Sequence, residues 1–313
     1  MFADIVYQSG DQYLQEFEDI QAALLVFIPC FIGLLMAIIA LYGCHKIPAM
    51  KSPFGYLTRY ELYLIIIASS NSGGFYLFGV LFNIKFILNN SQIAGLISTT
   101  LIPTVISLYL LISFNRFLAI VTPLYYSIIF KSKYRRIYVS ICYFVPLIYT
   151  PVFTWYYNCG YKFYHYGWVF SFIISDTCGT KFEVLLRGVQ SLFTAATFSV
   201  NVCTFILLVF FRKRVLKTTS AEVRKREMNF GQQVIIQGFV FTIYGIFYSF
   251  AYRWIPGNLA ENWKIFWTST FIANSLHIFN AGMIFVFNAE FSKWISSGNK
   301  VGTASVSMVK PIA

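Results

Sequence analysis

The sequence predicts an all-α membrane protein, a seven-transmembrane helix bundle with its N-terminus outside the cell and its C-terminus in the cytoplasm. Composition is the first observation behind this prediction. Of the 313 residues, 58% are hydrophobic and only 12% are charged, whereas about a quarter of a soluble domain is charged. The second observation is a set of seven apolar runs with charges confined to their ends, each long enough to cross a hydrocarbon layer of ~30 Å. We place them at residues 20–44, 60–82, 92–115, 137–155, 187–211, 233–255 and 264–287.

The distribution of Lys and Arg between these runs predicts the orientation. With the N-terminus outside, the inner loops and the tail hold sixteen of these cations and the outer side holds six. Short cytoplasmic loops are enriched in Lys and Arg, so the reverse orientation is disfavoured. We therefore expect residues 1–19 to be an extracellular N-terminus, residues 20–294 to be the transmembrane domain with a short juxtamembrane helix, and residues 295–313 to be a cytoplasmic tail.

The third run ends in a charge. Asn115 is followed by Arg116 and Phe117. The helical pattern is interrupted at Pro123, and a basic patch then begins. A guanidinium at the bilayer centre costs a few kcal/mol, so Arg116 must lie at the membrane edge or in a watered cavity. An ordinary interfacial arginine that reaches outward to water is the plainer alternative.

The longest outer loop spans residues 156–186. Between Lys162 and Asp176 it contains thirteen uncharged residues rich in aromatic side chains. This stretch is too short to span a membrane, and its composition predicts a β-hairpin. The predicted orientation also puts the only N-x-[ST] sequon, at Asn89, outside the cell, where glycosylation is possible.

Residues 113–126 contain Asn-Arg-Phe, then Ala-Ile, then Pro123 and Tyr126. This stretch resembles the NRF.AI..P..Y signature of nematode serpentine chemoreceptors of the class g superfamily, with class x nearest and class xa next. The resemblance covers residues 20–294. It implies a G-protein-coupled receptor for olfaction in the plasma membrane of a sensory cilium, with an odorant or pheromone-like ligand and a heterotrimeric G protein as partners. The residues then expected to contact the G protein are Asn115, Arg116, Phe117, Arg135, Arg136, Arg224 and Lys225.

The motif departs from the rhodopsin-like pattern in two places. The acidic residue of Asp/Glu-Arg-Tyr is replaced by Asn115 and the tyrosine by Phe117, so an acid–arginine lock cannot form there. We expect Glu227 or Glu61 to hold the inactive state instead. In the seventh run Asn280 stands where that family has Asn-Pro-x-x-Tyr, and a packed polar residue is the equal alternative. Asn71 in the second run could face Asn280, because polar groups in lipid need partners.

The outer-loop cysteines form a candidate disulfide. No cysteine lies between Cys44 and Cys142. The disulfide bond that joins the third helix of rhodopsin-like receptors to the second outer loop therefore cannot form. Cys159 and Cys178 can pair within the loop, which contributes ~3 kcal/mol in the chain-entropy model. Two free thiols are the alternative, which an oxidising exterior disfavours.

Ligand chemistry is predicted from an absence of charge. The sequence places no Asp or Glu in an outer half-helix, which favours a neutral or apolar ligand over an amine. Aromatic side chains in such helices also serve as core or as membrane-interface belts. The candidate lining residues are Thr99, Pro103, Ser107, Tyr248, Tyr252, Trp267 and Phe271.

Three other classes of protein fit less well. A small-molecule transporter, the main alternative, would show inverted repeats and paired broken helices, and the sequence has no internal repeat. An enzyme would need paired acids within the membrane, and no catalytic residues are predicted. The six cysteines and three histidines have no zinc spacing, so neither metal nor cofactor is expected. The net charge of +12 follows from orientation and contact with the lipid bilayer, so no nucleic acid is expected.

Overall fold

The computed structural model describes residues 12–156, 159–172, 178, 183–215, 259–287 and 289–296, with scattered positions between 236 and 255. Six of the described helices are long and apolar enough to cross a membrane. They match six of the seven predicted spans. The remaining span, 233–255, falls mostly outside the described residues.

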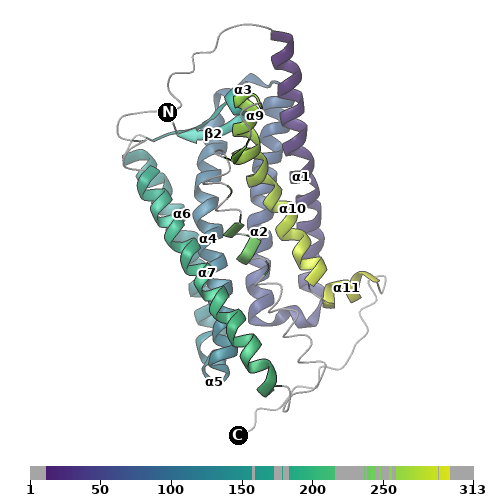
Figure 1. Cartoon of the computed structure of the whole chain (residues 1–313), viewed down its shortest axis with the longest axis vertical. Helices are drawn as coiled ribbons and strands as arrows, with labels where there is room; N and C mark the ends of the chain where they lie inside the picture. Colours follow the sequence, from purple (N-terminus) through teal and green to yellow (C-terminus); the bar gives the residue numbers. More distant parts are fainter. Residues whose placement is uncertain are drawn as a thin grey trace.

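The spanning helices run side by side in one bundle (Figure 1). All six are longer than predicted, and the first begins at Gln12 instead of residue 20. Two of them contain a π-helical segment, η2 within the second span and η5 within the last. The spans are α1 (Gln12–Lys46), α2 (Pro53–Gly74) continued by η2 (Phe75–Leu81), α4 (Ser91–Val121), α6 (Ser132–Tyr156), α7 (Glu183–Val215), and α9 (Glu261–Ile265) continued by η5 (Phe266–Phe271) and α10 (Ile272–Phe287).

Short elements close both ends of the bundle. One end carries α3 (Lys85–Asn89), in a connection predicted to be only a loop, and the hairpin of β1 (Tyr161–Tyr164), η3 (Tyr166–Trp168) and β2 (Val169–Phe172). The opposite end carries η1 (Pro48–Lys51), α5 (Pro123–Ile129) and α11 (Ala289–Ser296). The last of these is a helix where the juxtamembrane helix was predicted.

Local chemistry sets the start of α2. The Ser52 hydroxyl accepts a hydrogen bond from the Gly55 amide at 3.3 Å, and Pro53 occupies the first helical position. Both are typical of helix N-termini. Gly55 is required here, because a Cβ would lie 2.2 Å from the Met50 carbonyl oxygen. The chain can therefore turn tightly from η1 into α2.

Small side chains bring α1 and α10 together. Ala37, Ala40 and Ala281 are fully buried, and a Cβ on Gly33 would lie 3.0 Å from the Ile278 backbone nitrogen. Small residues allow close helix approach in membranes, where no hydrophobic effect drives helices together. Large apolar side chains instead face outward, as on α6, where Trp155 is 85% exposed. This inside-out pattern is expected of a bundle surrounded by lipid.

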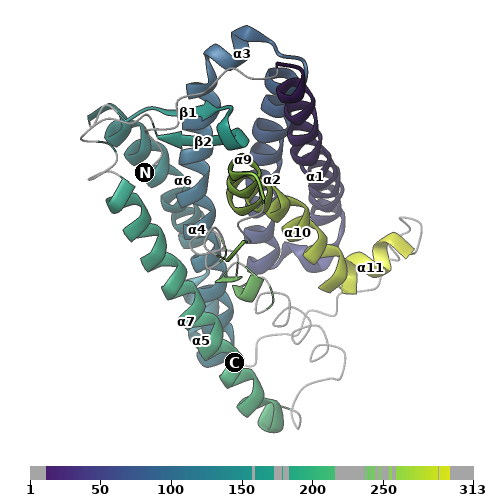
Figure 2. The same cartoon turned by 45° about the horizontal axis from the view of Figure 1, so that its top comes forward.

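Residues 161–172 form the predicted β-hairpin. Strands β1 and β2 are antiparallel, with Tyr161 opposite Phe172, and they lie across one end of the bundle (Figure 2). At the tip Gly167 has φ 75°, a conformation that favours glycine. Gly95 of α4 lets β1 approach, because a Cβ there would lie 1.9 Å from the Tyr161 carbonyl oxygen.

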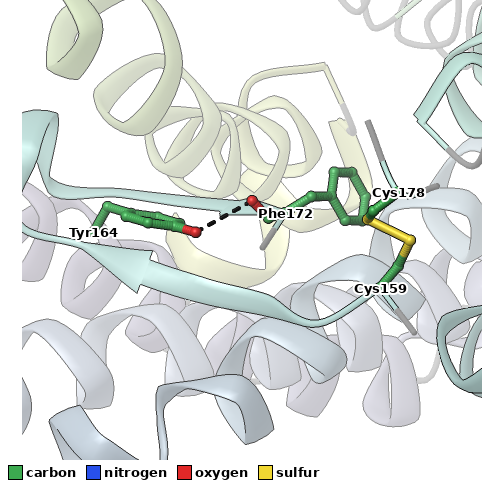
Figure 3. The surroundings of a disulfide bond; sticks show 4 residues. All are labelled: Cys159, Tyr164, Phe172 and Cys178. Carbon is green, nitrogen blue, oxygen red and sulfur yellow. Dashed lines mark hydrogen bonds between the residues drawn. A yellow bond between two sulfur atoms is a disulfide. The ribbon is translucent and has the colours of Figure 1, made fainter. Parts of the chain in front are cut away.

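The predicted disulfide between Cys159 and Cys178 is present. It lies beside the open end of the hairpin, where the Tyr164 hydroxyl donates to the Phe172 carbonyl at 3.3 Å (Figure 3). The bond ties the chain before β1 to the chain after β2.

Candidate functional site

At the end of the bundle that carries β1 and β2, the hairpin inserts one large side chain between the helices. Trp168 is 1% exposed. Its ring lies 4.9 Å from the Trp263 ring and 5.9 Å from the Phe266 ring, measured between centroids. A tryptophan is large and so rarely fully buried, and its burial at a loop tip shows that this hairpin is a plug that packs into the helices.

The backbone of the plug is bound by both π-helical segments. The Trp168 carbonyl accepts hydrogen bonds from the Tyr76 hydroxyl of η2 and from the Thr270 hydroxyl of η5, the latter at 2.9 Å. π-Helical turns are rare and occur frequently at functional sites. Here they direct two buried hydroxyl groups to one carbonyl oxygen.

Two acids on the first turns of α1 also bind at the end of the bundle that carries the hairpin. The Glu18 carboxylate accepts hydrogen bonds from Asn262 Nδ2 at 3.0 Å and from Trp263 Nε1 at 3.2 Å. Asp19 accepts from the Trp168 indole and lies 3.8 Å from His165 Nδ1. These bonds explain why α1 extends beyond its apolar run.

The structure brings together only some of the predicted ligand-lining residues. Trp267 and Phe271 lie beneath the plug, with ring centroids 4.7 Å apart. The buried Thr99 hydroxyl donates to the Gly95 carbonyl at 2.8 Å. The Ser107 hydroxyl lies 3.4 Å from the Cys142 carbonyl of α6, so it faces the seam between α4 and α6. Tyr248 and Tyr252 lie outside the described residues.

At the end of the bundle that carries α5, Asn115 joins two elements. Its side chain is fully buried, and its Nδ2 lies 3.2 Å from the Tyr126 hydroxyl, which in turn lies 3.5 Å from Asn115 Oδ1. Pro123 begins α5 and so turns Tyr126 back toward α4. The eleven-residue separation of Asn115 and Tyr126 in this motif therefore lets the two side chains meet between α4 and α5.

Arg116 points into the protein. It is 6% exposed, and its guanidinium carbon lies 3.6 Å from the centroid of the Phe54 ring on α2. This is a close cation–π contact. The alternative of an interfacial arginine reaching outward to water is therefore wrong. Phe117, the next residue, is half-buried.

The other residues predicted to contact the G protein differ in their surroundings. The Arg135 guanidinium carbon lies 4.3 Å from the Tyr56 ring centroid, so this side chain is directed to α2, whereas Arg136 is exposed. Arg224 and Lys225 lie outside the described residues. The partners of these arginines, Phe54 and Tyr56, could not be predicted, because nothing in the local pattern of residues 53–58 distinguishes their rings from the other aromatic side chains.

The prediction that Asn71 faces Asn280 is wrong for the Asn71 amide group. Its Nδ2 donates to the Ala94 carbonyl at 3.1 Å and to the Ser98 hydroxyl at 3.0 Å, both on α4. Asn280 is buried on α10.

Of the two acids predicted to hold the inactive state, the structure describes only Glu61. Glu61 is buried at 4% exposure and hydrogen-bonds Tyr109 of α4. Its role in restraining Arg116 remains a prediction. Glu227 lies outside the described residues. Asn89 is exposed on α3, and its glycosylation also remains a prediction. The described residues contain no cluster of His, Cys, Asp or Glu that could hold a metal ion.

Comparison with known proteins decides the family. The sequence model of the family described as serpentine type 7TM GPCR chemoreceptor Srx matches residues 27–288. The chain belongs to the Srx family. Serpentine receptor class X-43 of Caenorhabditis elegans is 36% identical over 296 residues, covering 95% of this chain and 92% of that protein. Serpentine receptor class X 45 of the same organism is 24% identical, covering 86% and 79%.

The fold of this Srx receptor also resembles a solved structure. Squid rhodopsin superposes with a TM-score of 0.70 at 16% identity, covering 93% of this chain and 87% of that one. The match confirms the predicted seven-transmembrane bundle. Family and fold together make the chain a multi-pass membrane receptor, and the prediction of class x as nearest is confirmed. The relatives are named as receptors, which favours this interpretation over the transporter alternative.

Proposed function

We propose that this Srx receptor binds a small, neutral or apolar, odorant- or pheromone-like molecule near the hairpin plug and activates a heterotrimeric G protein at the opposite end. The N-terminus is then outside the cell, and the receptor is in the plasma membrane of a sensory cilium. The observation that carries the proposal is Arg116, which is held inside the bundle against Phe54 at the end remote from the plug.

The chemistry beneath the plug supports an uncharged ligand. Two described acids beside it, Glu18 and Asp19, already accept hydrogen bonds from Trp263, Asn262 and Trp168. An amine would have to compete with these donors for the carboxylates. The remaining surroundings are aromatic rings, including Trp267 and Phe271, which bind apolar groups through contact area.

The inner end supports coupling through a change in helix packing. Arg116 and Asn115 are adjacent on α4, and each contacts a different element, α2 and α5 respectively. A shift of α4 relative to α2 would free the guanidinium toward the cytosol. Exposed cations follow α5 at the start of α6, namely Lys131, Lys133 and Arg136. They would attract an acidic partner and raise its association rate.

Nucleotide exchange on a promiscuous Gα subunit tests this function. The receptor is reconstituted in nanodiscs and challenged with a panel of volatile and water-soluble odorants. At least one odorant should accelerate exchange. Arg116→Gln should reduce that acceleration about tenfold or more, equivalent to ~1.4 kcal/mol, and Lys85→Gln, an exposed cation on α3, should leave it unchanged. Equal activity of the two variants would contradict the proposed coupling site.

A further inference from the structure

Two arginines from different helices share one tyrosine ring at the inner end. The guanidinium carbon of Arg135 on α6 lies 4.3 Å from the Tyr56 ring centroid, and that of Arg59 on α2 lies 5.5 Å from it. A tyrosine face attracts cations, which explains how two like charges are held together. The ring lies in the first turns of α2, at the end of the bundle that also carries α5.

The described part of the chain offers this pair no anion. No described residue gives either guanidinium a hydrogen bond or a carboxylate oxygen within 4.0 Å, and the Nε atom of each is buried without a hydrogen-bond partner. Buried donors without partners cost free energy, and two neighbouring cations repel each other. An anion with several acceptor oxygens, bound to the remaining guanidinium N–H groups, would offset the repulsion between the two cations.

The pair stands at the edge of a seam between α2 and α6. Tyrosines continue the seam from Tyr56 toward the middle of the bundle. The Tyr56 and Tyr60 hydroxyl oxygens lie 3.1 Å apart, and the Tyr143 hydroxyl of α6 donates to the Tyr60 carbonyl at 2.7 Å. Tyr63, the next tyrosine, is 41% exposed on a span that faces lipid. A molecule at the arginine pair can therefore lie with its apolar part along a lipid-facing seam.

We propose that Arg59 and Arg135 bind the headgroup of an anionic lipid that carries a phosphomonoester. A phosphomonoester has a charge of about −1.5 to −2 at pH 7, which matches the two guanidinium groups, whereas a phosphodiester has a single charge. Guanidinium groups bind phosphate oxygens through paired N–H donors. The lipid belongs to the cytoplasmic leaflet if the proposed orientation holds. The site itself does not depend on G-protein activation.

Lipid selectivity measured on the full-length receptor tests the site. The receptor is purified from nanodiscs that contain phosphatidylcholine with equal amounts of phosphatidylinositol 4,5-bisphosphate and phosphatidylserine. Native mass spectrometry then gives the ratio of the two anionic lipids retained. The ratio should clearly exceed one for the wild type. Arg135→Gln and Arg59→Gln should each lower it about tenfold, equivalent to ~1.4 kcal/mol.

Control variants separate a site from general surface charge. Lys133 is exposed on the same turn as Arg135, and a cation near an anionic surface attracts every anionic lipid. Lys133→Gln should therefore weaken retention of both lipids and lower their ratio less than Arg135→Gln does. Arg135→Lys keeps the charge but loses the planar stack, and Tyr56→Leu removes the ring. Both substitutions should lower the ratio of the two retained lipids, so the proposal can still be tested if Arg135→Gln does not fold.

Several outcomes would overturn the proposal. Equal retention of the two lipids by the wild type would mean that the receptor does not select a phosphomonoester, and equal ratios for Arg135→Gln and Lys133→Gln would leave only surface charge. Displacement of the lipid by millimolar inorganic phosphate would identify a site for free phosphate instead. Unchanged lipid selectivity in Arg135→Gln, with loss of nucleotide exchange, would assign the pair to the G protein. A failure of nucleotide exchange in the wild type leaves the lipid ratio intact as a separate readout.

Discussion

The contact between Asn115 and Tyr126 makes the most specific prediction about the inner end. Tyr126→Phe removes the hydroxyl that lies 3.2 Å from Asn115 Nδ2 and 3.5 Å from its Oδ1. The ring remains, so the packing of α5 against α4 changes little. Because Asn115 is fully buried, its amide cannot turn to water. Leaving a buried polar group without its partner costs about 1–3 kcal/mol.

Thermal stability measures that cost directly. A loss of 1 kcal/mol lowers the unfolding temperature of a domain of 150–250 residues by about 2–4 °C. We expect Tyr126→Phe to lower the temperature at which half of the nanodisc-embedded receptor aggregates by a few degrees. Since α5 would then be held less firmly, basal nucleotide exchange should rise in the same variant.

The adjacent tyrosine provides a matched control. Tyr125 is 63% exposed, and Tyr125→Phe removes the same atom from the same short helix. It should change the stability of the receptor by less than about 0.5 kcal/mol. If both variants are equally stable, the Asn115–Tyr126 bond does not hold α5, and our account of the motif spacing is wrong.

Three further substitutions test the outer end by the same thermal assay. Gly95→Ala places a Cβ 1.9 Å from a β1 carbonyl oxygen, so the hairpin must move and stability should fall by about 1–3 kcal/mol. Cys159→Ser opens a disulfide whose cysteines are 19 residues apart, which should cost ~3 kcal/mol. Glu18→Ala removes a carboxylate that accepts from two side chains of the last span and should cost about 1.5–3 kcal/mol. Each substitution has a matched control that should change the stability of the receptor little. A Cβ added at Gly188 of α7 would meet no atom within 4 Å, so Gly188→Ala should be neutral or slightly stabilising. Cys203→Ser changes an exposed free thiol, and Glu16→Ala changes an acid for which the described contacts show no hydrogen bond to the last span. A variant that destabilises no more than its control would show that the corresponding contact is absent from the folded receptor.

The features best predicted from the sequence are those that a single local pattern decides. The spans follow from apolar length, and the hairpin follows from an aromatic run too short to cross a membrane. The Cys159–Cys178 bond follows from the absence of any other outer cysteine in a position to pair. In each case few alternatives competed, so local chemistry was sufficient.

Features that depend on which face of a helix turns inward were predicted less well. Membrane helices are apolar on all sides, so periodicity could not show that Asn71 faces α4 or that Ser107 faces α6. The contacts of Arg116 with Phe54 and of Arg135 with Tyr56 join residues far apart in the chain. Since aromatics make up 20% of the sequence, no single one could be chosen in advance as the partner of a cation.

The length of α1 was also underestimated, for a related reason. Its first turns carry Glu16, Glu18 and Asp19, which end the apolar run. Two of these acids bind the plug and the start of the last span. Their helical state thus depends on tertiary contacts that hydropathy does not report.

The side of the membrane on which the N-terminus lies tests the central claim most directly. An epitope tag before residue 12 and a second tag after residue 296 are detected with antibodies in intact and in permeabilised cells. The account predicts that intact cells bind antibody to the N-terminal tag only, and that the C-terminal tag requires permeabilisation. An N-terminal tag that is detected only after permeabilisation would place Arg116 and α5 outside the cell and would contradict the proposed coupling end.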